Sequence, residues 1–300
     1  MKRAAKSVAR SRLRVVPAGD GLPAGELIDH PSRWSRPHVR TLVVASGKGG
    51  VGKSNCAANL AVCLGELGAR VLLVDADFAQ ANLDLLLGVH PRYDMQHLVN
   101  GEKSPEEIVT AGPRNVRLMP AASGAPELAE LDDVRREIVV RAISQLEADA
   151  DLVLIDTASG VGRSVTSLCL AADDVVIVTT PEMPAFSDAY GLIKLLQQQG
   201  LQRAPHLLIN MADTPEEAEE TAHRIRLVAR RFLRLEVDSW GHVPFDSSIA
   251  RAVRRQEPVV SAFPQSPAAQ AYRAIASRLW VRTQPDPSQD VDSAPQRLEA

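Results

Sequence analysis

Short apolar runs of strand length alternate with segments of helical periodicity from about residue 40 onward. The strand-like runs lie at 41–45, 70–75, 116–120, 151–156, 174–180, 206–211 and 237–244. The helical segments lie at 54–67, 132–146, 187–199, 216–233, 248–255 and 267–282. Because the runs are apolar on both faces and alternate with helices, the pattern predicts a three-layer α/β fold. Its central sheet is mostly parallel and has helices on both faces.

Two segments outside this pattern differ from it in composition. Residues 1–39 are basic and rich in Pro and Gly, and they lack the apolar stretch that a signal peptide needs. Residues 283–300 combine acidic residues with Pro and Ser. We expect a disordered N-terminal arm over 1–39, one domain over 40–282 and a disordered acidic tail over 283–300. A transit peptide is an alternative interpretation of the Arg-, Ala- and Ser-rich start.

Overall charge and composition narrow the classes of partner. Lys and Arg number 34 against 37 Asp and Glu, a formal net charge of -3, so no global field attracts nucleic acid or anionic lipid. The three cysteines include no close pair, and no apolar run has the roughly 18 residues of a membrane span. The sequence therefore favours a protein of the reducing cytoplasm without a specific nucleic-acid partner.

A glycine-rich loop separates the first predicted strand from the first predicted helix. Four residues lie between Gly47 and the Gly52-Lys53-Ser54 triplet, which satisfies the phosphate-loop pattern. Backbone N–H groups of such a loop and the positive end of the following helix bind phosphate. Lys53 would contact the β- and γ-phosphates, and the Ser54 hydroxyl would bind Mg²⁺. The predicted nucleotide-binding residues here are Gly47, Lys48, Gly49, Gly50, Val51, Gly52, Lys53, Ser54 and Asn55.

Lys48 is a second lysine in this loop, five residues before Lys53. An ordinary phosphate loop does not need it. One interpretation is a solvated loop lysine. The other is a cation that reaches across a subunit interface to a phosphate bound by the partner molecule, as an arginine finger does. In the second case the nucleotide becomes part of a dimer interface.

Three motifs together resemble the MinD/ParA family of ATPases. Lys48–Ser54 (KGGVGKS) resembles the deviant Walker A loop of that family. Asp75–Asp84 (DADFAQANLD) is similar to its first switch, and Asp156–Gly160 (DTASG) to its Walker B end and second switch. Segments 120–124 and 180–190 resemble the branch of FlhG (FleN), the flagellar-number regulators. The resemblance covers about residues 40–281.

The resemblance implies a P-loop NTPase fold and a function. It implies a protein that binds ATP and Mg²⁺, forms a homodimer when ATP is bound, and hydrolyses ATP slowly. In the FlhG-like interpretation it controls the placement or number of flagella through a protein partner of the flagellar or polar machinery. A MinD-like division-site regulator, a ParA-like DNA-partitioning ATPase and a nucleotide-binding scaffold without hydrolysis remain alternatives.

Two other classes on related folds are not favoured. An iron–sulfur carrier needs clustered cysteine ligands at a dimer interface, whereas Cys56 and Cys63 lie seven residues apart on one predicted helix and Cys169 stands alone. A tyrosine kinase of the capsule-export type resembles this fold but carries a tyrosine-rich tail, and no tyrosine follows Tyr272.

The two switches supply the predicted catalytic and metal residues. Asp75 and Asp77 follow the second strand, where an open α/β sheet binds its ligand. The resemblance assigns Asp77 to orienting the attacking water, and Asp75 is either functional or a helix cap. It also assigns Asp156 to a Mg²⁺-bound water, and Asn82 and Gly160 to sensing the γ-phosphate. The predicted catalytic residues are thus Lys48, Lys53 and Asp77, and the predicted metal residues are Ser54, Asp77 and Asp156.

A base site is predicted from two later segments. Asn210 ends a strand and could bind adenine through its amide. Pro244 and Asp246 lie in a segment that resembles the family residues on the other side of the base. Asp188 resembles a residue that contacts the signature lysine in the family, and its alternative is an N-terminal helix cap.

Two further helices have surface patterns with two interpretations each. An apolar stripe of Tyr272, Ile275, Ala276, Leu279 and Trp280 fits either a helix packed on its own domain, which we favour, or a membrane-binding helix. In the second case the protein is peripheral at the inner face of the membrane. Arginines at 224, 226, 230, 231 and 234 fit a DNA-binding face as in ParA, or simply the charge that a helix C-terminus favours.

Overall fold

The computed structural model describes residues 39–122 and 133–283. In these residues eight strands form one sheet in the order β3-β4-β2-β5-β1-β6-β7-β8, and every neighbouring pair is parallel except β3 and β4. The strands are β1 Arg40–Ser46, β2 Val71–Ala76, β3 Thr110–Ala111, β4 Val116–Met119, β5 Leu152–Ser159, β6 Asp174–Thr179, β7 His206–Ala212 and β8 Asp238–Pro244. The predicted α/β fold class is confirmed.

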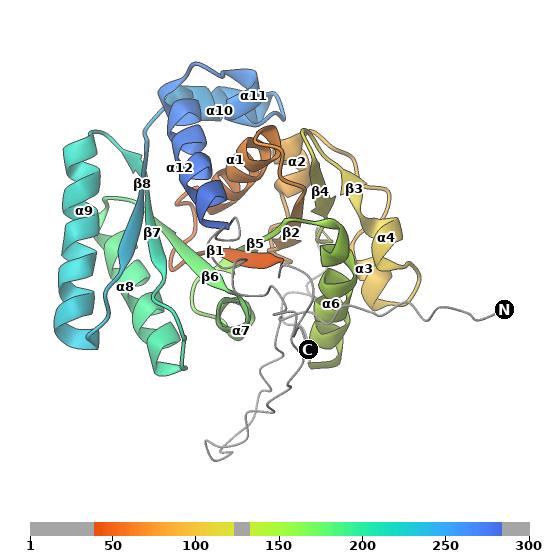
Figure 1. Cartoon of the computed structure of the whole chain (residues 1–300), viewed down its shortest axis with the longest axis horizontal. Helices are drawn as coiled ribbons and strands as arrows, with labels where there is room; N and C mark the ends of the chain where they lie inside the picture. The colour runs from red at the N-terminus through yellow and green to blue at the C-terminus, as the bar shows by residue number, and fades with distance from the viewer. Residues whose placement is uncertain (1–38, 123–132, 284–300) are drawn as a thin grey trace, which may run out of the picture.

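Helices cover both faces of this sheet (Figure 1). They are α1 Lys53–Glu66, α2 Leu83–Leu87, α3 Met95–Val99, α4 Pro105–Ile108, α6 Asp133–Leu146, α7 Arg163–Ala171, α8 Met183–Gln198, α9 Pro215–Val228, α10 Ser247–Arg254, α11 Val259–Ala262 and α12 Pro267–Thr283. A 3₁₀ turn, Glu147–Asp149, follows α6, and a π-helical turn, Ala229–Leu233, follows α9.

The sheet separates two hydrophobic cores. Alternate residues of β1 belong to different cores: Val43 and Ala45 to one, Leu42 and Val44 to the other. The first core includes residues of α3, α4, α6, α7, α8 and α9, and the second includes residues of α1, α2, α10, α11 and α12. Since successive side chains of a strand point to opposite faces, a strand buried on both faces must be apolar throughout.

Several short elements were absent from the sequence-based prediction. These are α2, α3, α4, α7, α11 and β3, most of which are too short for a periodic pattern to be distinguished. The helix predicted from Ser187 begins at Met183 because Pro184 occupies its first turn, where proline is tolerated. The helix predicted to reach Leu233 ends at Val228, where the π-helical turn begins.

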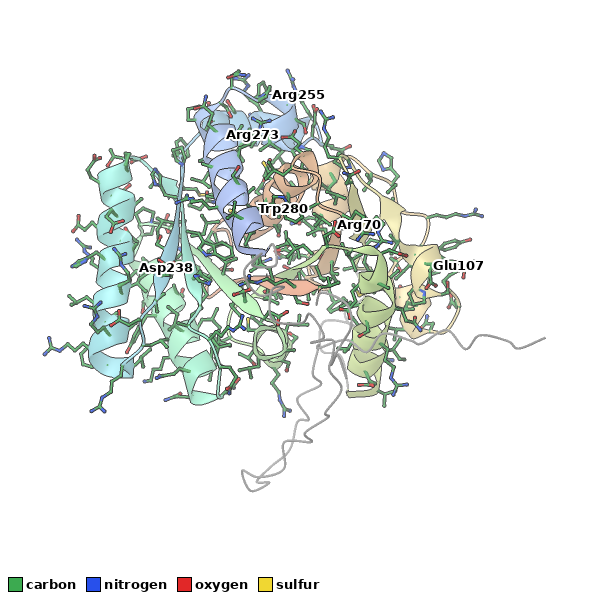
Figure 2. The ribbon with its side chains drawn as sticks, in the orientation of Figure 1. Arg70, Glu107, Asp238, Arg255, Arg273 and Trp280 are labelled. Atoms are coloured by element: carbon green, nitrogen blue, oxygen red, sulfur yellow. The ribbon has the colours of Figure 1, made fainter. Side chains whose placement is uncertain are left out.

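Helix α12 packs on its own domain, as we favoured. Tyr272, Ile275, Ala276 and Leu279 are buried in the second core, and Trp280 packs against it. Arg273, labelled with Trp280 on α12 in Figure 2, donates to the carbonyl oxygens of Val260 and Pro264 and pairs with Glu66 of α1. The apolar stripe is therefore packed against the domain in this structure. Every helix in the described part of the chain is too short or too polar to cross a membrane.

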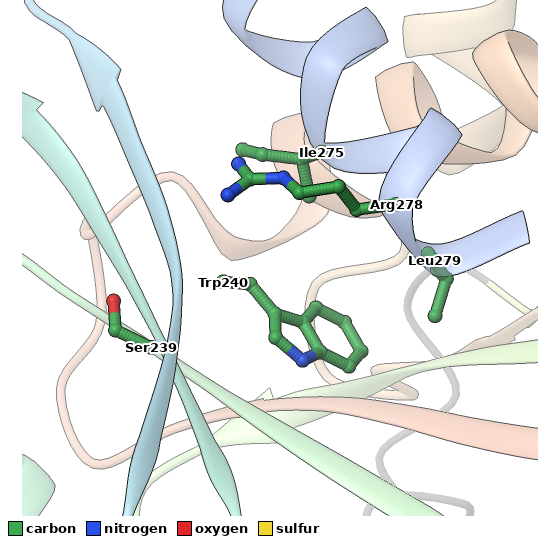
Figure 3. A pocket seen from close by; sticks show the side chains of 5 residues that line it. All are labelled: Ser239, Trp240, Ile275, Arg278 and Leu279. Carbon is green, nitrogen blue, oxygen red and sulfur yellow. The ribbon is translucent and has the colours of Figure 1, made fainter. Parts of the chain in front are cut away.

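The amino-terminal ends of the strands form one edge of the sheet, which we call the amino edge. Arg40 of β1 bonds the carboxylate of Asp174 of β6, and His206 of β7 lies 3.8 Å from the same carboxylate. The ring of His206 stacks on Trp240 of β8, with centroids 4.8 Å apart. Trp240 in turn lines a small pocket with Ile275, Arg278 and Leu279 of α12 (Figure 3). The opposite edge, where the parallel strands end, is the carboxyl edge.

The expected arm and tail fall largely outside the described residues. Of the segment 1–39 only residue 39 is described, and of 283–300 only residue 283. Ser123 and Gly124, in the segment 120–124, also lie outside the described residues. The expectations for these parts stay predictions.

Candidate nucleotide site

The glycine-rich loop, residues 47–52, connects the end of β1 to the start of α1 at the carboxyl edge. Gly52 caps α1 with a φ of 83° and without a side-chain bond to the helix. A β-carbon on Gly52 would lie 2.3 Å from the amide nitrogen of Asn210, so only glycine fits there. The first turn of this 14-residue helix therefore keeps N–H groups that no side chain caps, and such groups bind anions.

Gly47 is required by a close approach rather than by its dihedral angles. A β-carbon on Gly47 would lie 2.2 Å from the backbone oxygen of Asp188 in α8. The loop thus rests directly on the backbone of α8. Asp188 lies inside α8 and is exposed, and the residue at the N-cap position is Glu182, whose side chain makes no capping bond. The interpretation of Asp188 as an N-terminal cap was therefore wrong.

Lys53 gathers three of the predicted site residues around its ammonium group. Its Nζ lies 2.8 Å from Oδ1 of Asp156, 3.4 Å from Oγ of Ser54 and 4.0 Å from Oδ2 of Asp77. The Lys53 side chain is 7% exposed, and that of Asp156 is fully buried. The sequence-predicted phosphate and metal residues therefore share one small region, built from the start of α1, the residue after β2 and the strand β5.

Asp156 has an unusual electrostatic environment. Its second oxygen, Oδ2, is buried without a hydrogen-bond partner in the described structure. Burial raises the pKa of Asp156, and this effect outweighs the opposing ones of Lys53 and of the Ser54 hydroxyl. A buried carboxylate oxygen without a donor is costly unless a cation or a cation-bound water neutralises it. The donor set, a carboxylate and a serine hydroxyl beside a phosphate loop, fits a hydrated Mg²⁺ ion.

Asp75 has a different role from its neighbour Asp77. Its buried carboxylate accepts backbone N–H bonds from Asp77, Asn82 and Leu83, at 3.1, 3.2 and 3.2 Å. Burial and the nearby charge of Asp156 raise the pKa of Asp75 to about 7. Asp77 is more exposed and accepts from the N–H of Gln80. The helix-cap interpretation of Asp75 agrees with its bond to the first residue of α2.

The two predicted phosphate sensors, Asn82 and Gly160, differ in their hydrogen bonds. Asn82 precedes α2, and its side chain makes no capping bond. The N–H of Gly160 donates to the carbonyl oxygen of Ser46 at 2.8 Å. A contact between the Gly160 amide and a γ-phosphate would require that this bond break, so this assignment stays a prediction.

Lys48 pairs with a residue that the sequence did not single out. Its Nζ lies 2.8 Å from Oε2 of Glu182, at the start of α8, and both side chains are accessible, at 36% and 66%. The described contact of Lys48 is therefore with Glu182 rather than with Asp188. The available signal was the position of Glu182 in the segment 180–190, directly before a helix that begins with proline.

The predicted base residues differ in how far their polar groups are already hydrogen-bonded within the protein. Asn210 is buried at the end of β7, donates from Nδ2 to the carbonyl oxygen of Val51 at 2.8 Å, and has a buried, unpartnered Oδ1. Pro244 ends β8. The Asp246 carboxylate accepts the N–H bonds of Ser248 and Ala268, so it caps α10 and ties it to α12. The roles of these residues toward adenine stay predictions.

A comparison with known families decides the class of this site. The family model described as ParA, NUBPL iron-transfer P-loop NTPase, matches residues 38–280. The chain belongs to the ParA family. It is thus a P-loop NTPase, in agreement with the glycine-rich loop and with the order of the strands in the sheet.

Similar proteins of the ParA family include two with flagellar names. The chain is 37% identical over 241 residues to the antiactivator FleN of Pseudomonas aeruginosa, covering 80% of this chain and 86% of FleN. It is 32% identical over 248 residues to the flagellum site-determining protein YlxH of Helicobacter pylori, with coverage of 82% and 83%. The septum site-determining protein MinD from Pyrococcus horikoshii, solved with Mg-ADP, has a TM-score of 0.69 and 27% identity, covering 80% of this chain and 96% of that chain.

Proposed function

We propose that this protein is an ATP-dependent dimerising switch with slow ATP hydrolysis that regulates the number or placement of flagella. The observation that supports it best is the division of roles between the two lysines of one loop. Lys53 is buried against Asp156 within its own chain, whereas Lys48 lies at the surface on an accessible partner, Glu182. This difference supports a role for Lys53 toward the nucleotide of its own chain and a role for Lys48 toward a second molecule.

ATP would bind across the loop and the start of α1. The N–H groups of residues 49–54 surround the phosphates, and Lys53 balances their charge. Ser54 and Asp156 would hold hydrated Mg²⁺, which when bound neutralises charge on the phosphates. The unpartnered Oδ2 of Asp156 is available for that contact. Asn55, Asn82 and Gly160 complete the proposed phosphate side, and Asn210, Pro244 and Asp246 the proposed base side.

Asp77 is the proposed residue that orients the attacking water. Its Oδ2 lies 4.0 Å from Nζ of Lys53, and its Oδ1 is fixed by the N–H of Gln80 at 3.0 Å. A carboxylate held beside the phosphate-binding cation is well placed to accept a hydrogen bond from water in line with the γ-phosphate. Hydrolysis then resets the switch to the monomer.

The flagellar assignment is supported by the two relatives with flagellar names, FleN at 37% identity and YlxH at 32%. A MinD-like role in cell division is the alternative, which the similarity to the MinD structure favours. A ParA-like role on DNA has less support. Arg224, Arg226 and Arg230 pair with Glu220, Glu219 and Glu236, so much of the positive charge on α9 and the turn after it is neutralised.

An iron-carrying role, which the family description mentions, has less support than a nucleotide switch. Metal-bound cysteine is the thiolate, which forms readily in exposed electropositive surroundings. Cys56, Cys63 and Cys169 are all buried, and burial raises the pKa of each thiol to about 12. These cysteines are typical of core residues.

The dimer is tested by light scattering with ATP and Mg²⁺. We expect the mass of the wild type to double and that of Lys48→Ala to stay monomeric. Lys194→Ala is the matched control, because Lys194 is an exposed lysine of α8. Doubling in all three proteins would contradict the assignment of Lys48 to the interface.

The flagellar role is tested by deleting the gene in the organism that encodes it and counting flagella by electron microscopy. We expect a changed number or position that the wild-type gene restores and the Lys48→Ala gene does not. Normal flagella together with misplaced septa would instead support the MinD-like alternative.

A further inference from the structure

The Asp75 carboxylate closes the loop between β2 and α2 at both of its ends. Oδ1 accepts the N–H of Asp77 at the start of this loop, and Oδ2 accepts the N–H groups of Asn82 and Leu83 at its end. Residues 77–82, between these bonds, include both the proposed water-orienting residue and a proposed phosphate sensor. One side chain thus fixes the span of the first switch.

The same carboxylate also anchors the start of α2. Asn82 occupies the capping position of α2, and asparagine there usually accepts an N–H bond from the first turn. Here Asn82 makes no such bond, and Asp75, seven residues earlier, binds two other amides at the start of the helix, the N–H groups of Asn82 and Leu83. A helix of five residues is marginal by itself, so it depends on such an anchor.

We infer that Asp75 is a positioning residue that clamps the first switch and anchors the start of α2, while the Asn82 side chain, which makes no capping bond, stays available to the nucleotide. The inference rests on the proposed function for its nucleotide part. Its structural part, the clamp itself, can be measured without nucleotide.

The chemistry of the side chain explains why an aspartate is needed. A buried carboxylate is costly unless its oxygens are hydrogen-bonded, and three N–H donors meet that need here. An asparagine at this position offers one oxygen, and its NH₂ group would face an N–H donor at the other end of the loop. Asp75→Asn therefore releases at least one end of the clamp with almost no change in volume.

The clamp predicts a specific pattern of amide hydrogen exchange in the nucleotide-free protein. First-turn amides of a helix normally lack a partner and exchange rapidly. We expect protection of the amides of Asn82 and Leu83, whereas the next amide, of Asp84, has no acceptor in the described structure and should exchange rapidly. Equal exchange at Leu83 and Asp84 in the wild type would overturn the clamp, whether or not any variant folds.

Two variants separate the roles of Asp75 and Asn82 in the same experiment. In Asp75→Asn the protection at Asn82 or Leu83 should be lost, while the matched control Asp84→Asn retains it. In Asn82→Ala the Leu83 amide should stay protected, because its acceptor is the Asp75 carboxylate and not the Asn82 side chain. Loss of Leu83 protection in Asn82→Ala would overturn the inference that Asp75 anchors the start of α2.

Turnover provides the functional measurement. We expect Asp75→Asn to lower kcat for ATP by about 10- to 100-fold with KM changed by less than about threefold, because the loop is displaced while the phosphate loop is intact. A raised KM with unchanged kcat would overturn the positioning role. If the wild type does not hydrolyse ATP, the proposed function fails while the exchange pattern still tests the clamp. If the wild type hydrolyses ATP but lacks the protection, only the clamp fails.

Discussion

The two edges of the sheet place aspartates in opposite electrostatic situations. At the amino edge, Asp174 is buried beside Arg40 and His206; burial alone would raise its pKa, but its bonds to these two residues hold the pKa well below its usual value. At the carboxyl edge, burial raises the pKa of both Asp75 and Asp156. The charged form of aspartate is thus stabilised at the amino edge and destabilised at the carboxyl edge.

The difference distinguishes Asp174, whose carboxylate is satisfied by neighbouring residues, from Asp156, which keeps one oxygen without a partner in the described structure. At the amino edge the Asp174 carboxylate has Arg40 and His206 as partners. Two ring nitrogens there, Nδ1 of His206 and Nε1 of Trp240, are buried without hydrogen-bond partners among the described residues. At the carboxyl edge, one oxygen of Asp156 and one of Asn210 are buried without partners. A buried carboxylate oxygen without a donor, as in Asp156, is costly and is typical of a site that a cation or a bound ligand completes.

Replacing the aspartate of the amino edge should affect stability most. In Asp174→Asn the Arg40 guanidinium loses the carboxylate to which it is bonded, although Asp173 stays nearby, and breaking this partly exposed pair costs about 2 kcal/mol. We expect the free energy of unfolding in urea to fall by that amount, while ATP turnover per folded molecule is unchanged. A loss below about 0.5 kcal/mol would contradict the contrast between the edges.

The pH dependence of this loss follows from the sign of the shift. The folded pKa of Asp174 lies below its unfolded value, so its contribution is complete above the unfolded pKa of about 4 and is lost as the pH falls toward the folded pKa. The gap between wild type and Asp174→Asn should therefore be constant from pH 7 to 5 and shrink below about pH 4. A gap that closes between pH 7 and 5 would contradict this assignment.

The matched substitution at the carboxyl edge should affect turnover instead. We expect Asp77→Asn to lower kcat for ATP about 10²-fold, because an amide positions and polarises water less well than a carboxylate. The affinity for ATP, measured by calorimetry, and the free energy of unfolding should change little. Unchanged turnover would move the catalytic role to another residue, with Asp75 the first candidate.

The smallest expected effect concerns the surface pair at the same edge. Glu182→Gln removes the partner of Lys48, and an exposed pair of this kind is worth about 0–1 kcal/mol. We expect the proposed ATP dimer to form with a dissociation constant up to about fivefold lower, an effect that disappears at high salt. Glu236→Gln, which removes the partner of Arg230, is the control. A weaker dimer would mean that Glu182 itself supports the interface.

The sequence predicts the fold well because its signals are local. Strands such as β1 and β6 are runs of apolar residues that any parallel sheet buries on both faces, and their observed bounds lie within a residue or two of the predicted ones. The glycine-rich loop was equally clear, because all the residues that define it lie in one short segment of the chain.

The rest of the site depends on contacts between distant residues. Nothing near Lys48 indicates that Glu182, 134 residues later, is its partner. Helix α2 was missed because five residues are too few for a helical pattern, and its start is anchored by Asp75, which lies in the preceding strand. Asn210 was predicted to contact a base, yet its amide nitrogen is bound to the phosphate loop, a pairing that only the folded sheet creates.

The glycines of the phosphate loop differ in why they must be glycine, and a genetic library could separate the reasons. Gly50 and Gly52 have left-handed backbones, with φ of 80° and 83°, and Gly47 is blocked by the backbone of α8. A β-carbon on Gly49 would meet only the Ser159 hydroxyl, at an ordinary 3.4 Å. Selection for folding alone should therefore accept alanine at 49 and reject it at 47, 50 and 52. A selection for nucleotide-dependent activity that also rejects alanine at 49 would reveal a demand made by the ligand and not by the fold.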